Sequence, residues 1–226
     1  MKNVTLALTG VAMLTTMASA QDLLWDNMPF GPAGGFMSSQ LDLVYPFDSQ
    51  VADDYQLGAG WAIQAVEWNG GFWGGSPVDI PDWNLLFYAD AGGMPTGGPE
   101  DPTGTALAQY IVSGADIEIT LEGDGSYTYY YELPEDFVSS GDVEWFAVQA
   151  VFPFPPQWGI ATALDSIQMS ECYGGFPLLG TPYWTPGSDP SYFGSARDTA
   201  FRLYGIPGPG ALALLGLAGL VGTRRR

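Results

Sequence analysis

The sequence predicts an all-β fold: an antiparallel sandwich of two sheets, of the jelly-roll type, with a closed barrel as the alternative. Several short runs alternate between apolar and polar residues, as strands with one buried face do. Aromatic residues make up 14% of the chain, and 31 glycines and 18 prolines suit short strands joined by turns. Between residues 21 and 205, no window of eleven residues or more has the apolar stripe of a helix.

The first half of this body predicts four strands. Residues 41–45 and 50–57 alternate on either side of a proline, and residues 61–68 alternate with a slip of one residue that indicates a bulge. A turn at residues 69–71, Asn-Gly-Gly, is expected to end the third strand. Residues 83–90 are apolar on both faces, which is typical of a central strand covered on both sides.

The second half starts with a predicted loop at residues 91–104, rich in Gly, Pro and acids, and a strand at 105–112. The clearest element is a hairpin in which residues 117–121 and 127–133 alternate around the turn Glu122-Gly123-Asp124-Gly125. Strands at 143–152, 158–164 and 198–205 complete the prediction, with a long ordered loop at 170–194.

The charge of the chain excludes two classes of partner. Six basic residues stand against 25 acidic ones, and four of the six lie in the terminal segments. The body between them keeps two arginines against all 25 acids, which gives it a net charge of −23. Such a polyanion repels nucleic acid and anionic lipid. We therefore expect no nucleic-acid partner, and contact with a membrane only through the C-terminal tail.

Missing residue types narrow the chemistry further. The chain has no histidine, so it cannot form a Ser-His-Asp or Cys-His nucleophile or a histidine zinc site. The body has no lysine for Schiff-base chemistry, and Cys172 is the single cysteine, which we expect to be buried and structural rather than reactive. Carboxylate chemistry remains: paired acids for glycoside cleavage, or oxygen ligands for calcium.

Residues 1–20 have the pattern of a signal peptide. Lys2 supplies the positive start, an apolar stretch runs from residue 4 to 17, and Ala18-Ser19-Ala20 precedes a cleavage point before Gln21. A buried amino-terminal helix is the alternative. We expect the mature chain to begin at Gln21 and the protein to be exported.

Residues 206–226 form a second targeting pattern. Ile206-Pro207-Gly208-Pro209-Gly210 precedes an apolar run at residues 211–222, which Thr223 and three arginines follow. As a helix this run would span roughly 18 Å, against a hydrocarbon core of about 30 Å. It therefore suits a short helix held in the membrane for a time, with its arginines on the cytoplasmic side, and then cut.

This arrangement resembles the PEP-CTERM tail that exosortase-type transpeptidases process in Gram-negative bacteria. Gly208 stands where that family has Glu. The resemblance implies a sorting transpeptidase of the exosortase type as a partner. It assigns the sorting role to Pro207, Gly208, Pro209, Arg224, Arg225 and Arg226.

Short phrases in the body resemble a domain that often precedes such tails in secreted bacterial proteins. They are Val51-Ala52-Asp53-Asp54-Tyr55, the spaced set Trp61, Ile63, Val66, Trp68, Gly70 and Gly71, and Phe201-Arg202-Leu203 followed by Gly205. The resemblance implies a β-sandwich and carries no assigned activity. The body at residues 21–205 is therefore predicted to be one domain.

Two groups of side chains are candidate binding sites. Asp48, Asp53 and Asp54 at a strand entry could meet Asp198 if the first and last strands pair, which would form a carboxylate cage for calcium; a solvated sheet edge is the alternative. The aromatic set could stack on sugar rings or could simply cover the core. It comprises Trp68, Phe72, Trp73, Tyr183 and Trp184.

Two pairings complete the candidates. Glu67 with Glu144 could act as acid and nucleophile in glycoside hydrolysis, although no spacing singles out that pair. Arg202 in the closing strand is predicted to pair with Asp53 or Asp54 in a neighbouring strand, because scarce cations settle where negative potential is highest.

Taken together, the sequence predicts an exported, non-enzymatic protein of the cell surface or extracellular matrix. The alternative is a carbohydrate-binding module for extracellular polysaccharide, and a glycoside hydrolase is a third, weaker hypothesis. Calcium is the only candidate cofactor.

Overall fold

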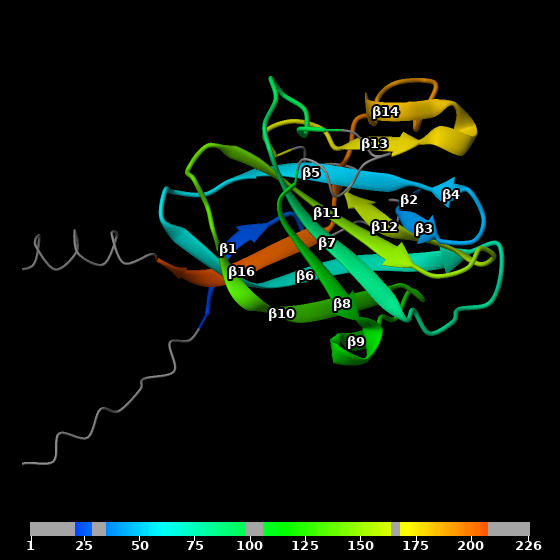
Figure 1. Ribbon diagram of the computed structural model, residues 1–226, viewed down its shortest axis with the longest axis horizontal. Coiled ribbons are helices and arrows are strands. Elements are labelled where there is room, and N and C mark those ends of the chain that lie inside the picture. The colour runs from blue at the N-terminus through cyan, green and yellow to red at the C-terminus, as the bar shows by residue number, and fades with distance from the viewer. Residues whose placement is uncertain (1–20, 29–34, 98–105, 164–167, 208–226) are drawn as a thin grey trace, which may run out of the picture.

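The body is a sandwich of two β-sheets (Figure 1). The computed structural model describes residues 21–28, 35–97, 106–163 and 168–207, over which the chain forms sixteen strands in two eight-stranded sheets. Within these ranges no helix is long and apolar enough to cross a membrane. The predicted all-β, two-sheet fold is confirmed, and the jelly-roll connectivity stays a prediction. The predicted signal peptide and the predicted C-terminal helix lie outside the described residues.

The first sheet, here called sheet A, is organised around its longest strand. β6 pairs with β10 on one side, and on the other with β16 along its first part and with β12 along its last. The members of sheet A are β1 (Asp22–Asp26), β2 (Phe36–Ser38), β6 (Trp61–Trp73), β9 (Glu118–Leu121), β10 (Tyr127–Val138), β12 (Gln157–Ala163), β15 (Asp198–Thr199) and β16 (Phe201–Pro207).

The second sheet, sheet B, centres on β11, which lies between β5 and β7. Its members are β3 (Gln40–Asp42), β4 (Phe47–Asp48), β5 (Gln50–Gln56), β7 (Asp82–Ala89), β8 (Ala106–Ser113), β11 (Val143–Val151), β13 (Tyr173–Phe176) and β14 (Thr181–Pro186). Short 3-10 helices, η1 (Gly114–Asp116) and η2 (Pro177–Leu179), join β8 to β9 and β13 to β14. The end of β11 runs parallel to β3, so the predicted antiparallel pattern has an exception.

Large aromatic side chains fill the space between the sheets. Trp83 from sheet B meets Trp68, Tyr129 and Trp158 from sheet A, with ring centroids 4.8 to 5.3 Å from that of Trp83. All four rings are buried, and the Trp158 indole N–H donates to the Tyr129 hydroxyl at 3.1 Å. Burying rings of this size supplies much of the hydrophobic stabilisation of such a core.

A second, smaller cluster covers the outer face of sheet B. Leu86 and Tyr88 of β7 pack there with Trp145 of β11 beneath Trp184 of β14. The prediction that residues 83–90 form a central strand covered on both faces is therefore confirmed, because Trp83, Leu85 and Phe87 face the main core. The β13–β14 hairpin that supplies this cover lies within the predicted loop at 170–194, so that prediction was wrong.

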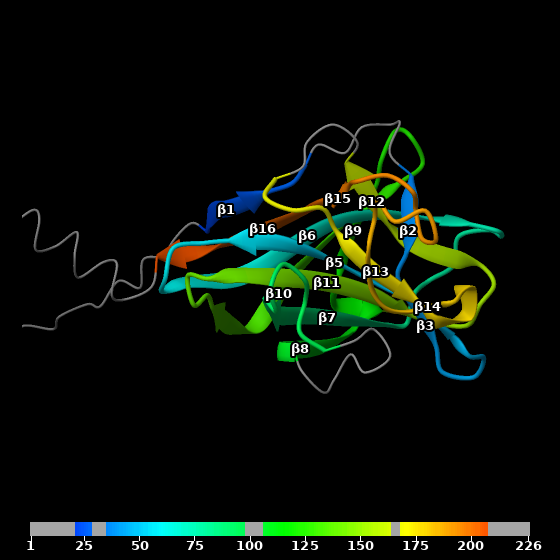
Figure 2. The ribbon, with the colours of Figure 1, turned by 90° about the horizontal axis from the view of Figure 1, so that it is seen from above.

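The length of β6 fixes the two ends of the sandwich. Its first residue, Trp61, pairs with Pro207, and Asp22 pairs with Gly205, so both terminal segments join the body at one end. Phe72 lies eleven residues further along β6, roughly 35 Å away at about 3.3 Å per residue. We call these the tail end and the distal end; Figures 1 and 2 show them on opposite sides of the molecule.

The predicted turn at residues 69–71 was wrong, because these residues continue β6. An added Cβ on Gly70 would overlap the Trp158 ring, and one on Gly71 would overlap Phe36. The two glycines therefore do not form a turn. Because they have no side chain, they leave room for the rings of Trp158 and Phe36 to pack directly against the backbone of β6. The bulge predicted in residues 61–68 is confirmed against β16, because Ala65 and Ile63 pair with the consecutive residues Tyr204 and Gly205 and leave Gln64 as the extra residue. On the other side of β6, β10 also has an irregularity between Glu132 and Phe137.

Close backbone packing at Gly159 gives a test of this architecture. A Cβ at this position would overlap the Met37 carbonyl group, which belongs to the neighbouring strand β2 and cannot rotate away. We expect Gly159→Ala to lower the free energy of unfolding by about 1–3 kcal/mol or more. Gly123→Ala is the matched control, because nothing lies within 4 Å of its added Cβ. Equal denaturation midpoints for the two variants would contradict the β2–β12 packing.

Candidate functional site

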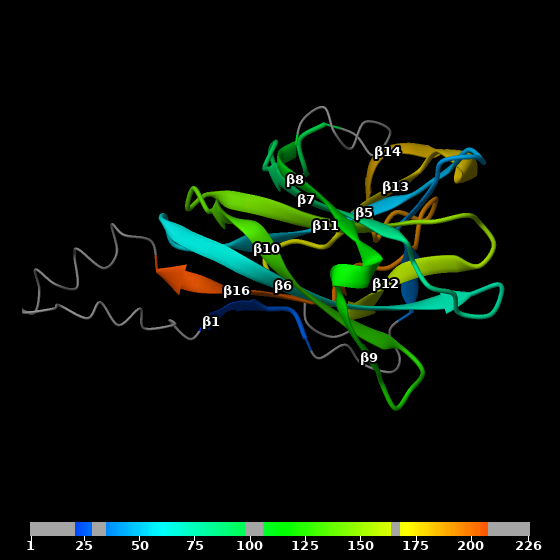
Figure 3. The same cartoon turned by 60° about the horizontal axis from the view of Figure 1, so that its bottom comes forward.

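A groove of about 450 Å³ lies between the β9–β10 hairpin and the connection from β6 to β7. It is lined by Phe72, Pro77, Val78, Asp79, Ile80, Ile119, Tyr127 and Tyr129. Phe72 places it at the distal end of the sandwich. Figure 3 shows the β9–β10 hairpin projecting beyond the body there.

The groove continues the inner face of sheet A past the edge of sheet B. Ile119 lies opposite Tyr129 and Leu121 opposite Tyr127, so these residues share the face that packs the core. Tyr129 is 2% exposed, yet Ile119 is 53% exposed and Leu121 65%. The apolar surface of the groove is therefore the continuation of the inner face of sheet A. It is buried at Tyr129 in β10 and exposed to solvent at Ile119 in the neighbouring strand β9.

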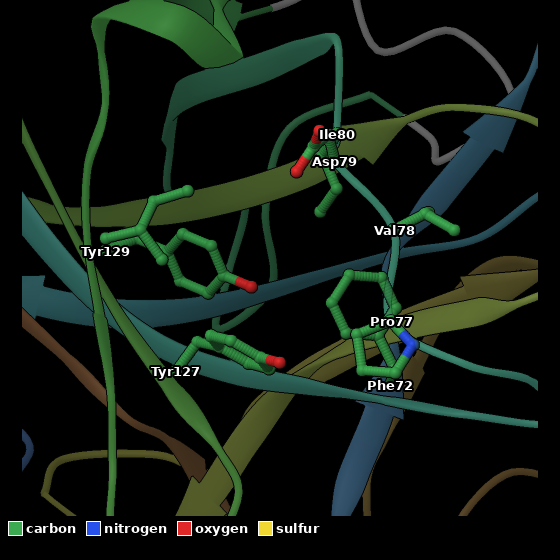
Figure 4. Close-up of a pocket in the computed structure, with 8 residues that line it drawn as sticks. Phe72, Pro77, Val78, Asp79, Ile80, Tyr127 and Tyr129 are labelled. Carbon is green, nitrogen blue, oxygen red and sulfur yellow. The ribbon is translucent and has the colours of Figure 1, made fainter.

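Aromatic rings and a few polar groups converge in the groove (Figure 4). Phe72 meets Tyr127 edge-to-face, with ring centroids 5.9 Å apart. The hydroxyl groups of Tyr127 and Tyr129 point toward the middle of the groove, and Asp79 lies across from them. Asp79 is the single carboxylate among the eight lining residues. An apolar hollow with a few convergent polar groups is the usual form of a small-ligand site.

A larger hollow of about 560 Å³ is a weaker candidate. Its lining includes Asp90, Asp142 and Glu144 but no aromatic ring. The carboxylate of Asp90 already accepts hydrogen bonds from the Trp145 indole and from two backbone N–H groups. Asp90 is therefore already engaged in structural hydrogen bonds, and the hollow offers no ring on which a ligand could stack.

The predicted sugar-binding rings are distributed over different parts of the fold. Trp68 is fully buried in the main core, and Trp184 covers the second cluster, so neither offers a free face. Trp73 stacks on Phe36 with a centroid distance of 6.3 Å, and Tyr183 is 74% exposed on β14. Of the five, Phe72 lines the groove. Tyr127 and Tyr129, which line the groove with it, were not predicted as site residues. Their alternation along the predicted hairpin is the one sequence signal that could have indicated them.

Three of the four predicted calcium ligands gather in a buried junction. Asp53 lies on the core side of β5, where its Oδ2 accepts from the backbone N–H of Thr199 at 2.5 Å and from the Asn27 amide at 3.2 Å. Asp198 Oδ2 accepts from the backbone N–H of Gln168 at 2.5 Å. Asp54 points to the other face of β5 and accepts from both the backbone and the hydroxyl of Ser170.

These buried carboxyls hold protons more tightly than free ones. Desolvation raises the pKa of Asp198 to about 7, helped by the nearby charge of Asp54 and opposed by the Gln168 hydrogen bond. Desolvation and the charge of Asp198 also raise the pKa of Asp53 well above its ordinary value. The pKa of Asp54 is raised by desolvation as well.

The fourth predicted ligand, Asp48, lies elsewhere. It belongs to β4, and its Oδ1 accepts from the Gln149 amide at 2.8 Å. Among the residues that the structure describes, no group of three or more acidic or cysteine side chains is arranged to hold a metal ion. Calcium binding therefore stays a prediction, now restricted to the junction of Asp53 and Asp198.

Arg202 pairs with other partners than predicted. Its guanidinium contacts Asp26 of β1 and Glu67 of β6, both at 2.9 Å. Phe201 and Leu203 face the core, so Arg202 points out of sheet A, whereas Asp53 and Asp54 belong to sheet B. The predicted pairing was wrong because the early strand that carries the two aspartates is not a neighbour of β16. β1, which sequence periodicity did not reveal, takes that place.

The proposed acid pair for glycoside hydrolysis is not assembled. Glu67 lies in sheet A and is held by Arg202, whereas Glu144 lies in sheet B and accepts from the backbone of Ser140. Cys172 is buried and 3.5 Å from the sulfur of Met37, as expected for a structural cysteine.

The buried junction predicts a pH dependence of stability. A pKa of about 7 in the folded state, against an ordinary 3.8, means that the folded protein binds more protons than the unfolded chain between these values. The free energy of unfolding should therefore fall as the pH rises from about 4 to about 7. Urea titrations of the protein at several pH values measure it, and Asp198→Asn should flatten the fall.

Carboxyls with lowered pKa do not mask this effect. The pKa values of Asp124 and Asp189 lie below 3.8, so these groups add pH dependence below the window. Stability that rises between pH 5 and pH 7 would contradict the assignment. Calcium added at pH 7.5 tests the metal hypothesis in the same samples, because a stabilising site must lose its effect in Asp198→Asn.

Comparison with known proteins gives no further guide to this geometry. No family model, curated protein or solved structure matches the chain. The function has to be argued from the residues themselves.

Proposed function

We propose that this is an exported, non-enzymatic protein of the cell surface or extracellular matrix, directed by its C-terminal tail. The proposal is supported by the signal-peptide pattern at residues 1–20 and the PEP-CTERM-like pattern at residues 206–226. An exosortase-type transpeptidase would be the partner that processes this tail. Pairing of Asp22 with Gly205 brings both segments to the tail end, so an attached body would extend its distal end outward.

Tail processing has a direct test. Intact-mass measurement of the surface protein from producing cells should give a species that lacks residues 1–20 and 211–226. Deleting Arg224 to Arg226 should leave the precursor misplaced, because the arginines hold the orientation of the tail. A mature species that still carries residues 211–226 would contradict cleavage.

We further propose that the sandwich binds carbohydrate, and the groove at Phe72 and Tyr127 is the observation that carries this proposal. Flat rings pack against the apolar faces of sugars, while Asp79 and the Tyr127 hydroxyl can hydrogen-bond sugar hydroxyls. The groove offers a single carboxylate, whereas glycoside hydrolysis commonly needs two, so its composition favours binding over cleavage.

Charge and architecture narrow the ligand. A body with 25 acidic residues and two arginines repels acidic polysaccharides, so a neutral saccharide is the class we propose. We infer that the sandwich is of jelly-roll type, an architecture that lectin domains use.

A glycan array compares the full chain with three variants. Neutral oligosaccharides should bind, and Phe72→Ala should weaken the affinity about tenfold or more, the amount that loss of about 1.4 kcal/mol of stacking produces. Asp79→Asn should also weaken binding without disturbing the fold, because Asp79 is exposed. Tyr183→Ala is the control, since this exposed ring lies on β14, away from the groove.

Two outcomes would contradict the proposal. Binding that survives both groove substitutions would place the ligand elsewhere. Release of reducing sugar by the protein would establish an enzyme.

A further inference from the structure

Three connections at the distal end carry exposed apolar side chains. They are the turn between β3 and β4, the connection between β11 and β12, and η2. The residues, here called the apolar cap, are Leu43, Val44, Tyr45, Phe154, Leu178 and Leu179. Val44 is 93% exposed and Leu43 80%. Figures 1 to 3 all show these connections at the end opposite the start of β1 and the end of β16.

Aromatic packing beneath the cap joins the three connections. Phe47 stacks on Phe154 with ring centroids 4.6 Å apart, and meets Phe176 edge-on at 4.8 Å. Tyr45 lies over Phe154 at 6.4 Å. Phe47 and Phe176 are buried, so the exposed residues stand on a fixed base rather than on separate loose loops.

Part of the cap backbone is held by internal hydrogen bonds. Asp42 Oδ1 accepts from the N–H groups of Val44 and Tyr45, and its Oδ2 accepts from the N–H of Phe154. Phe47 N–H donates to the Tyr45 carbonyl, and Gly180 N–H to the Pro177 carbonyl. Prolines, which have no N–H to satisfy, occupy positions 46, 153, 155, 156 and 177.

These hydrogen bonds fix the turns in water, and they would also spare the bonded N–H groups the cost of entering a medium that cannot hydrogen-bond them. The interior of a lipid bilayer is such a medium. The cap also has Tyr and Phe at its base, the residue types that suit the interface of a bilayer.

Charge decides between possible occupants. The six exposed side chains of the cap carry no charge, the Asp42 carboxylate at their base is buried and hydrogen-bonded, and the two arginines of the body lie in β16 and just before β15. An anionic membrane would be repelled by the acidic body, and a second copy would bring the same net charge against it. A lipid surface without net charge would not be repelled by the acidic body in either of these ways.

We propose that the apolar cap inserts into a zwitterionic lipid surface. Because it lies at the opposite end from the tail, that surface is a different one from the membrane that holds residues 211–222. The chain would then contact lipid at both ends, whereas the sequence predicted contact through the tail alone. This inference is independent of the groove and its ligand.

The test uses the full chain and a readout confined to the cap, because the apolar tail can bind vesicles by itself. A thiol introduced by Val44→Cys takes an environment-sensitive fluorophore, whereas Cys172 is fully buried and should not react. The control label is at Ile111→Cys, which is 74% exposed on β8. Phosphatidylcholine vesicles should shift the emission of the label at position 44 to the blue and leave that at position 111 unchanged.

Two further arms sharpen the result. Leu43→Ser with Leu178→Ser, in the labelled background, should lower the apparent vesicle affinity about tenfold or more, because each substitution removes an aliphatic side chain that the lipid would bury. Vesicles rich in phosphatidylglycerol at low salt should give a smaller shift than phosphatidylcholine.

The opposite outcomes overturn the proposal. No shift at position 44 with phosphatidylcholine would mean that the cap stays in water. A blue shift that needs no lipid and grows with protein concentration would mean that a second copy covers the cap.

Discussion

A single long strand, β6, sets the geometry on which the rest of the body depends. Its thirteen residues pair with β16 at the tail end and with β12 at the distal end, and with β10 along most of the strand between. Continuity through Gly70 and Gly71 keeps these pairings in one sheet, because a turn there would have ended the strand before Phe72. The separation between tail and groove follows from this length.

The two sheets are also joined by polar groups inside the protein. Asp53 of sheet B accepts from Asn27 and Thr199, which belong to the side of sheet A. Asn27 Oδ1 and Asp198 Oδ1 have no hydrogen-bond partner among the described residues. A proton on Asp198 would turn one of these acceptors into a donor, which is consistent with its raised pKa. Buried acceptors of this kind are costly when unpaired, so the junction favours a proton or a cation.

Residues 168–170 cover this junction and are held by hydrogen bonds to its aspartates. Backbone N–H groups of Gln168 and Ser170 donate to Asp198 and Asp54, on either side of Met169. Met169 has a φ of 69°, a strained value for a residue with a side chain. The two hydrogen bonds offset that strain, since they fix the neighbours on both sides. The conformation of the cover is therefore tied to the ionisation of the carboxyls beneath it.

Sequence pattern predicted the elements that have a clear local pattern of apolar residues and missed those defined by long-range pairing. The hairpin around Glu122–Gly125 follows from alternation, and the central strand at 83–90 follows from a run that is apolar on both faces. β1 and β2 are short, with five and three residues, and the β13–β14 hairpin contains Gly and Pro, so pairing with their partners makes these segments strands. Arg202 illustrates the consequence. Alternation with Phe201 and Leu203 places Arg202 on the outer face of sheet A, but the identity of its partners depends on β1.

The candidate site was harder to predict than the fold for a related reason. Trp68 and Tyr129 belong to the same stacked pair in the core, yet Tyr127, two residues before Tyr129 in β10, is only partly buried and forms an open side of the groove. Nothing in the local sequence distinguishes a tyrosine under sheet B from one just beyond its edge. Exposure of the groove depends on where the opposite sheet stops, whereas the apolar cap is exposed because it lies in the connections between strands. A protein held by its tail would thus present both the groove and the apolar cap to its surroundings.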